Sequence, residues 1–265
     1  MKTLYSASSK LLLLLLLLSA ACSKEDSPEL VGAGSACTAP YVAPIIADAY
    51  NFPVRPGTAA WQQFTTGQAM VDACQIPATT LQTISTPGLL ATCLDYPLLF
   101  DVLAFNSLQR GTRAQLEDFN GFGELRKRPD AASLLLERYQ NMGPSCLPAG
   151  QLQRGDYSFR FSFVEMILAQ DEYLAQLSAS KRRTLLREAL TKYNEKKPLT
   201  SSFYSTFGLS TSVFIMARVM QAEQYQPFLT AIRNDSDLEA FVADVVVKDK
   251  SPVLDTVIGY ALRFQ

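Results

Sequence analysis

The chain has 265 residues, of which 24 are basic and 25 are acidic, and it contains no histidine. A near-neutral chain lacks the clustered basic surface that nucleic acids attract, so we expect no nucleic-acid partner. The missing histidine excludes Ser-His-Asp triads, Cys-His dyads and metal sites built on imidazole. We therefore expect no metal and no cofactor.

The first 21 residues have the features of a secretory signal peptide. Lys2 and Lys10 supply the positive charge, the leucine run 11–18 supplies the apolar segment, and small residues follow it. The leucine run is too short to span a bilayer, which needs about 20 apolar residues. Removal of residues 1–21 leaves a mature chain of roughly 244 residues, enough for one large domain or two small ones.

Cys22 follows the signal directly, in the segment Leu-Ser-Ala-Ala-Cys over 18–22. This segment resembles the lipobox of bacterial lipoproteins, with Ser19 where leucine is usual. In such signals the cysteine thiol is acylated and the preceding peptide is removed. The resemblance implies lipidation at Cys22, with palmitate among the acyl groups, and an exported protein that contacts the outer membrane through lipid alone.

Residues 22–57 are expected to form a tether between the lipid and a globular domain. Their Pro, Gly and Ser content is typical of a flexible spacer, which would become ordered where Tyr41, Ile45 and Ile46 pack. The stretch 23–27 (Ser-Lys-Glu-Asp-Ser) resembles the surface-export signal of lipoproteins from the Bacteroidota. The plain alternative is a solvated tether, so periplasmic and surface-facing placements both stay open.

Residues 58–265 carry helical patterning almost throughout. Trp61, Met70 and Val71 suggest a first amphipathic helix, and three prolines spaced ten residues apart are expected to begin short helices, because proline suits a first helical turn. We expect Thr86 to cap the second of these. The prolines are Pro77, Pro87 and Pro97.

Four further helices follow from apolar spacing and capping residues. The expected segments are 130–139 with Asp130 as cap, 158–177, 179–194, and 236–246 with a Ser236–Glu239 capping box; a last helix begins at Ser251-Pro252. The alternation in 159–163 is strand-like but runs into a helical pattern. The prediction is an all-α fold, either an irregular multi-helix bundle or a helix-pair superhelix.

Residues 61–139 carry short motifs that are similar to an uncharacterised lipoprotein family of the Bacteroidota. The family has no established activity, so the resemblance implies an exported α-helical protein and transfers no catalytic residue. The matching positions are 75–77 (Gln-Ile-Pro), 84–86 (Ile-Ser-Thr), 94–97 (Leu-Asp-Tyr-Pro), 119–121 (Phe-Asn-Gly), 124–125 (Glu-Leu), Arg128, 131–132 (Ala-Ala), Leu136 and Tyr139.

Four cysteines remain once Cys22 is lipidated, and an exported chain meets oxidising conditions. Three complete pairings are possible. Cys37 and Cys146 lie in segments flanked by Gly and Pro, whereas Cys74 and Cys93 lie in helical patterns. We favour a Cys37–Cys146 disulfide, with Cys74 and Cys93 either paired or packed as small apolar side chains.

Carboxylates are the main route to catalysis left to a chain without histidine. Glu165 lies in an apolar segment where burial could raise its pKa, Glu172 follows seven positions later, and Asp101 also has apolar neighbours. Two such groups could cleave a glycan. The alternatives are an exposed helix face for Glu165 and Glu172, and an ion-pair or capping role for Asp101.

Two other patterns have both functional and structural explanations. The basic segment 181–197 could touch anionic lipid, or it is the solvated face of a helix. The aromatic residues of 203–207 could floor a sugar or peptide groove, or they belong to the core. We expect a non-catalytic binding or scaffold module that presents a helical surface to an envelope protein or glycan, with a carboxylate-dependent glycan-cleaving enzyme as the alternative.

Overall fold

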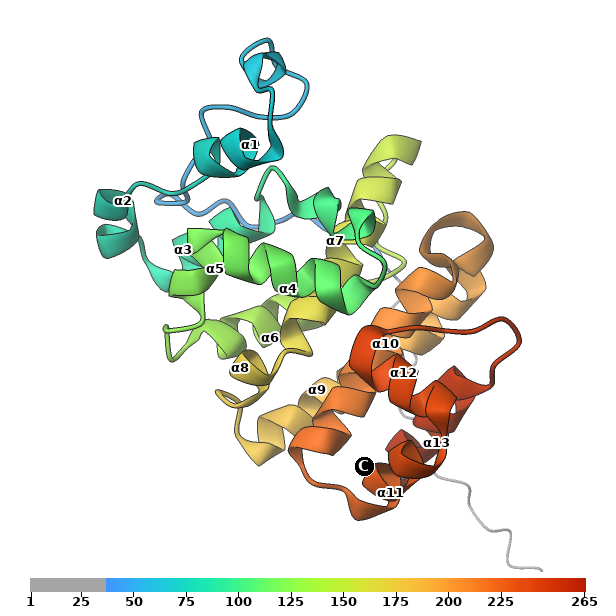
Figure 1. The fold of residues 1–265 in the computed structure, drawn as a ribbon. Coiled ribbons are helices and arrows are strands. Elements are labelled where there is room, and N and C mark those ends of the chain that lie inside the picture. The colour runs from blue at the N-terminus through green and yellow to red at the C-terminus, as the bar shows by residue number, and fades with distance from the viewer. Residues whose placement is uncertain (1–36) are drawn as a thin grey trace, which may run out of the picture. The chain divides into compact units, whose positions relative to one another are not determined.

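A computed structural model describes residues 37–265, and this part of the chain is built from helices without a strand (Figure 1). The predicted all-α class is confirmed. The elements of its first half are η1 Trp61–Gln63, α1 Gly67–Ala73, α2 Ala78–Thr83, α3 Thr86–Leu94, η2 Leu99–Ala104, α4 Leu108–Asp118, α5 Asn120–Leu125 and α6 Ala131–Asn141.

The second half contains the longer helices. They are α7 Gln151–Leu168, α8 Asp171–Leu174, α9 Ala179–Lys196, η3 Lys197–Leu199, η4 Thr200–Tyr204, α10 Ser205–Ala222, α11 Gln226–Asn234, α12 Ser236–Asp244 and α13 Val253–Phe264.

Helix α10 is the central element of the core. Residues 213–217, the most apolar stretch outside the signal, are completely buried in it, and α10 packs against α7, α9 and α13. An apolar helix that is surrounded on all sides needs no polar face. Within residues 37–265, no helix has both the length and the apolar character to cross a bilayer.

The short helices of the first half begin near their prolines, but the details differ from expectation. Ser85, not Thr86, caps α3 by accepting a hydrogen bond from the Gly88 amide at 3.1 Å. Pro87 then occupies the first turn, as expected. Pro97 begins no α-helix; a turn and the 3-10 helix η2 follow it. The single helix expected over 61–71 is divided into η1 and α1.

Several other expected caps and boundaries were also wrong. Asp130 makes no capping hydrogen bond, and the cap of α12 is Asp235, which accepts from two backbone amides, so Ser236 is already helical. That helix ends at Asp244 because Val245 has a left-handed backbone, with φ of 59°. The helix expected over 158–177 is broken after Leu168.

The residues of the family-like motifs contact one another in the core. The Asn120 side chain accepts from the Ile76 amide at 3.0 Å and donates to the Ile76 carbonyl at 2.8 Å. The Gln75 side chain accepts from the Asn120 amide at 2.9 Å, and the rings of Tyr96 and Phe119 stack at 4.1 Å. These motif residues therefore join α1, α3 and α5 into one packed unit.

The part of the expected tether that the structure describes, from Cys37 to residue 57, packs against the globular domain. Residues 37–57, here called the strap, contain no helix but lie against the helices: the Tyr50 amide donates to Thr92 Oγ1 at 2.8 Å, Asp48 accepts from the Ser85 amide at 2.7 Å, and Phe52 is buried. The strap belongs to the compact unit, so the globular part does not start at residue 58. The signal, Cys22 and residues 23–36 lie outside the described residues.

Candidate functional site

Glu165, the leading catalytic candidate from sequence, lies in the core and is 0% exposed. Its Oε2 lies 2.5 Å from Lys196 Nζ of α9, and its Oε1 accepts from Tyr139 of α6 at 2.7 Å. The hydroxyls of Thr211 and Ser212, both on α10, also donate to it. Helices α6, α9 and α10 thus supply the partners of this carboxylate of α7, and the alternative of an exposed helix face for Glu165 was wrong.

The ammonium group of Lys196 also has several hydrogen-bond partners in the core. Besides Glu165, its ammonium donates to the Gly208 carbonyl at 2.8 Å and to Ser212 Oγ at 3.0 Å, and it lies 4.5 Å from the ring centre of Phe161. Burial lowers the pKa of Lys196, and the adjacent carboxylate acts against that shift. Because both charges are fully hydrogen-bonded and 0% exposed, the pair stabilises one packing of α7, α9 and α10 and leaves no space for a substrate.

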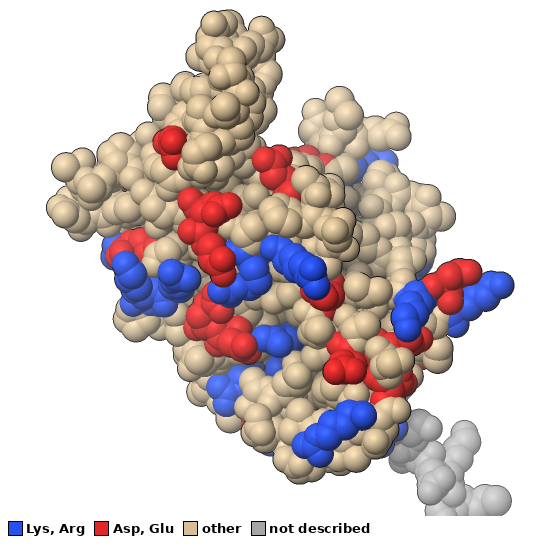
Figure 2. All heavy atoms as spheres, viewed as in Figure 1, with Lys and Arg blue, Asp and Glu red and all other residues tan. Residues whose placement is uncertain are grey.

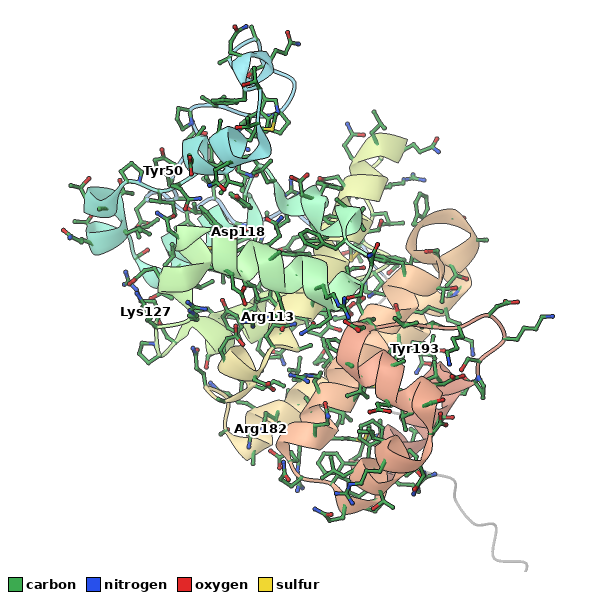
Figure 3. All side chains as sticks on the ribbon, in the orientation of Figure 1. Tyr50, Arg113, Asp118, Lys127, Arg182 and Tyr193 are labelled. Atoms are coloured by element: carbon green, nitrogen blue, oxygen red, sulfur yellow. A yellow bond between two sulfur atoms is a disulfide. The ribbon has the colours of Figure 1, made fainter. Side chains whose placement is uncertain are left out.

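Glu172 and Asp101 do not join Glu165 in a shared site. Glu172 lies on α8, beyond the break after α7, and pairs with Arg113 of α4 at 2.6 Å (Arg113 is labelled in Figure 3). Asp101 lies on η2 and is exposed as a residue, and partial burial of its carboxyl group raises the pKa of that group. The idea that Glu165 and Glu172 share one helix face was wrong, because the helix ends between them.

The cysteines divide into one disulfide and two buried thiols. The structure contains the favoured Cys37–Cys146 disulfide. It joins two cysteines 109 positions apart in sequence and attaches the strap to the loop between α6 and α7. Cys74 and Cys93 are free and buried. Burial raises the pKa of Cys74 to about 11 and that of Cys93 well above its ordinary value, so both act as small apolar groups rather than nucleophiles.

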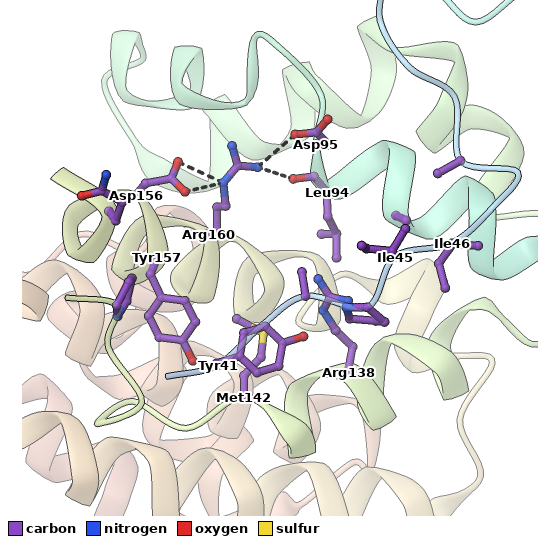
Figure 4. A pocket seen from close by; sticks show the side chains of 16 residues that line it. Tyr41, Ile45, Ile46, Leu94, Asp95, Arg138, Met142, Asp156, Tyr157 and Arg160 are labelled. Carbon is purple, nitrogen blue, oxygen red and sulfur yellow. Dashed lines mark hydrogen bonds and ion pairs between the residues drawn. The ribbon is translucent and has the colours of Figure 1, made fainter. Parts of the chain in front are cut away.

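A concave feature of the described chain runs along the strap. Two adjoining hollows of about 600 Å³ and 410 Å³ open between the strap and helices α3, α6 and α7; we call them together the strap groove (Figure 4). Ligand pockets typically have volumes of about 300–1,000 Å³. The residues that line both hollows are Tyr41, Pro44, Ile46, Ala91, Leu94 and Arg138.

Arg138 and Tyr41 are the polar residues at the centre of the strap groove. The Arg138 guanidinium lies over the Tyr41 ring, 5.3 Å from its centre. Arg138 Nε and the Tyr41 hydroxyl are both buried and have no hydrogen-bond partner among residues 37–265. Burial lowers the pKa of Arg138 and raises that of Tyr41, while each partly opposes the other's shift. Two buried donors in a groove are therefore unsatisfied.

Arg160 lines the same groove but forms an ion pair with Asp156. Its Nε donates to Asp156 at 2.9 Å and its Nη1 donates to the Leu94 carbonyl at 2.6 Å, with Asp95 3.9 Å away. Figure 4 shows this cluster across the groove from Arg138. Arg138 has no ion-pair partner among the described residues, so it is the cation of this groove that a ligand can bind.

Sequence reasoning missed both Arg138 and Lys196, although each carried a signal. Arg138 follows Leu134 by four positions and so shares its helix face, and Lys196 continues the apolar series that includes Ala189 and Tyr193. A charge on an apolar face indicates a buried partner or a site. Reading 181–197 as a solvated basic face was wrong at Lys192 and Lys196, which are both buried.

Charges elsewhere are mixed in sign. On the face shown in Figure 2, basic and acidic side chains alternate without a single-sign patch. Many are paired between elements, as Arg110 is with Asp244 at 3.1 Å and Arg182 with Glu223 at 2.5 Å. Among the described residues, no cluster of Cys, Asp and Glu side chains could hold a metal ion.

Comparison with protein-family models, with characterised proteins and with solved structures finds no match to this chain. The site is therefore interpreted from its own residues.

Proposed function

We propose that this protein is an exported lipoprotein of the bacterial outer envelope, anchored through Cys22, whose α-helical domain is a non-catalytic binding module. The segment 18–22, which resembles a lipobox, and the motifs within residues 61–139, which resemble those of lipoproteins from the Bacteroidota, support this localisation. The strap groove supports the binding role. The partner is an envelope component, either part of a protein or glycan or a smaller molecule.

The observation that carries this proposal is the pair of unsatisfied donors, Arg138 Nε and the Tyr41 hydroxyl, in an open groove. An unsatisfied buried donor costs about 1–3 kcal/mol, and folded proteins keep few of them. A ligand that accepts hydrogen bonds at this place recovers that free energy. The groove is therefore better suited to a bound molecule than to being empty.

The glycan-cleaving alternative has less support. It requires two accessible carboxyl groups about 5–10 Å apart on either side of a sugar bond. Glu165 is sealed in the core by Lys196 and three hydroxyls, and Glu172 is held by Arg113. Among residues 37–265, the contacts of these carboxylates favour a binding module over a glycan-cleaving enzyme.

Site-specific photocrosslinking tests the proposal. Ile45 lies on the strap, lines the groove and is 97% exposed, so a photoreactive residue there meets whatever enters. Leu262 of α13, 46% exposed, is the matched control. We expect, in protein isolated from the native host, an adduct of defined mass at position 45 alone and an acylated Cys22. Equal labelling at both positions, or an unmodified Cys22, would contradict the proposal.

A further inference from the structure

Arg138 has a charge that the rest of the groove does not neutralise. The larger hollow is lined by Arg138, Arg160, Asp95 and Asp156, and both aspartates lie beside Arg160. The smaller hollow adds Glu137, which is exposed and makes no ion pair with Arg138. Since guanidinium groups stay protonated in proteins, a half-buried positive charge lies at the centre of the groove without a counter-ion from the described chain.

The position of Arg138 is held in advance of binding. Its neighbour Tyr41 is fixed because the Tyr41 amide donates to the Cys146 carbonyl at 2.9 Å, next to the Cys37–Cys146 disulfide. Burial raises the pKa of Tyr41, so its hydroxyl stays protonated and available as a donor. A ring and a guanidinium that are already in contact lose little conformational entropy when an anion arrives.

The surrounding surface is apolar. Leu94, Met142, Pro44 and Ile46 line the larger hollow near Arg138, and Leu90 and Leu134 line the smaller one. Figure 4 shows Leu94, Met142 and Ile46 around the space into which Arg138 extends. A ligand for this groove therefore combines one anionic group with an apolar body, because burial of each CH₂ contributes about 0.8 kcal/mol.

The acidic residues of the groove limit the charge of the ligand. Asp95, Asp156 and Glu137 all line it, and like charges at close range are repulsive. A single carboxylate can form a bidentate pair with Arg138, whereas a dianionic phosphate brings a second charge that finds no free cation.

We propose that the strap groove binds a small monocarboxylate with an apolar chain, with the carboxylate on Arg138 and the chain along the strap. The Tyr41 hydroxyl provides a second donor to the carboxylate. This inference rests on the proposed function of the groove as a binding site and adds the chemical class of the ligand.

Octanoate, octanol, octylammonium and octyl phosphate test the inference, because they share a chain and differ in the head group. Their binding is measured by isothermal titration calorimetry to the lipidated chain in nanodiscs, with empty nanodiscs as blank. We expect octanoate to bind at least tenfold more tightly than each of the other three. Equal affinities for octanoate and octanol, or tighter binding of octyl phosphate than of octanoate, would overturn the inference. This comparison uses the parent chain alone and needs no variant.

Variants then locate the head group. Arg138→Gln is expected to bring octanoate down to the affinity of octanol while leaving octanol unchanged, and the exposed Arg187→Gln is the matched control with no expected effect. If Arg138→Gln keeps the octanoate preference, the assignment to Arg138 is wrong. Absence of a head-group preference in the parent chain, together with an adduct at position 45, would reject the carboxylate but retain the binding function; absence of both would reject both.

Discussion

Glu165 and Lys196 show at the scale of single residues how a polar pair can specify a core. The two charges are 31 residues apart in sequence and 2.5 Å apart in space, and neither is exposed. Removal of one partner leaves the other charged and buried, which is more costly than replacement of both. Their role is to make one arrangement of α7, α9 and α10 more favourable than others.

Lys196→Met is therefore expected to lower the free energy of unfolding by about 3–5 kcal/mol, because it leaves Glu165 as an uncompensated buried carboxylate. Adding Glu165→Gln should recover part of this loss, since a neutral amide oxygen still accepts from the hydroxyls of Tyr139 and Ser212. Urea denaturation measures both. The neighbouring, exposed Lys197→Met is the control and should change stability by less than about 0.5 kcal/mol. Equal effects at 196 and 197 would contradict the interpretation.

At the scale of elements, close contacts between backbones decide how short helices pack. Gly111 lies within α4, where a Cβ atom would be 2.2 Å from the Val102 carbonyl oxygen of η2. Helix α4 can lie this close to η2 only because position 111 has no side chain. Gly155 lies within α7 and faces open space. A side chain is therefore excluded at position 111 and can be accommodated at position 155.

Gly111→Ala is expected to destabilise the fold by about 1–3 kcal/mol, because backbone atoms must move to admit the methyl group. Gly155→Ala should instead stabilise it by about 0.5–1 kcal/mol, because alanine favours a helix and meets no neighbour. Thermal unfolding of the two variants beside the parent chain gives both values. A Gly111→Ala variant as stable as the parent would show that α4 and η2 are not in close contact.

At the scale of the whole molecule, the core contains many buried phenols. Burial raises the pKa of seven tyrosines above the ordinary value of about 10. The five with the large shifts are Tyr96, Tyr139, Tyr157, Tyr173 and Tyr204. Below pH 10 both the folded and the unfolded states keep these protons, so the tyrosines cause no pH dependence there. Above pH 10 the unfolded state loses protons that the folded state keeps, so stability must fall as pH rises.

We expect the free energy of unfolding to decrease above about pH 10, by up to about 1.4 kcal/mol per pH unit for each such tyrosine. Lys196 acts in the opposite direction, because its folded pKa is lowered, but it is one group against five. Tyr173→Phe should reduce the slope without loss of a hydrogen bond, since its hydroxyl has no partner in the described chain. Urea titrations between pH 8 and pH 11 test this; a flat profile would contradict it.

The sequence alone determined the helical character of this protein, the approximate positions of several helices and the favoured disulfide, but no expected segment corresponded to α4, α10 or α11. Apolar residues spaced by three and four, prolines at first turns and glycine-flanked cysteines are local signals, and they need no knowledge of distant contacts. The same local patterns placed two caps one residue late, at Thr86 and Ser236 in place of Ser85 and Asp235, because neighbouring hydroxyls and carboxylates compete for the same amides.

Only the tertiary structure decided which polar residues are buried together and where a groove opens. A helical pattern tells which face of a helix is apolar, but not which other helix covers that face. Glu165 meets Lys196, and Tyr41 of the strap meets Arg138 of α6, through contacts between segments far apart in the chain. Such contacts depend on how all the helices pack together. For this reason Glu165, a catalytic candidate from sequence, lies in the core, and Arg138, which no sequence pattern had singled out, lies in the groove.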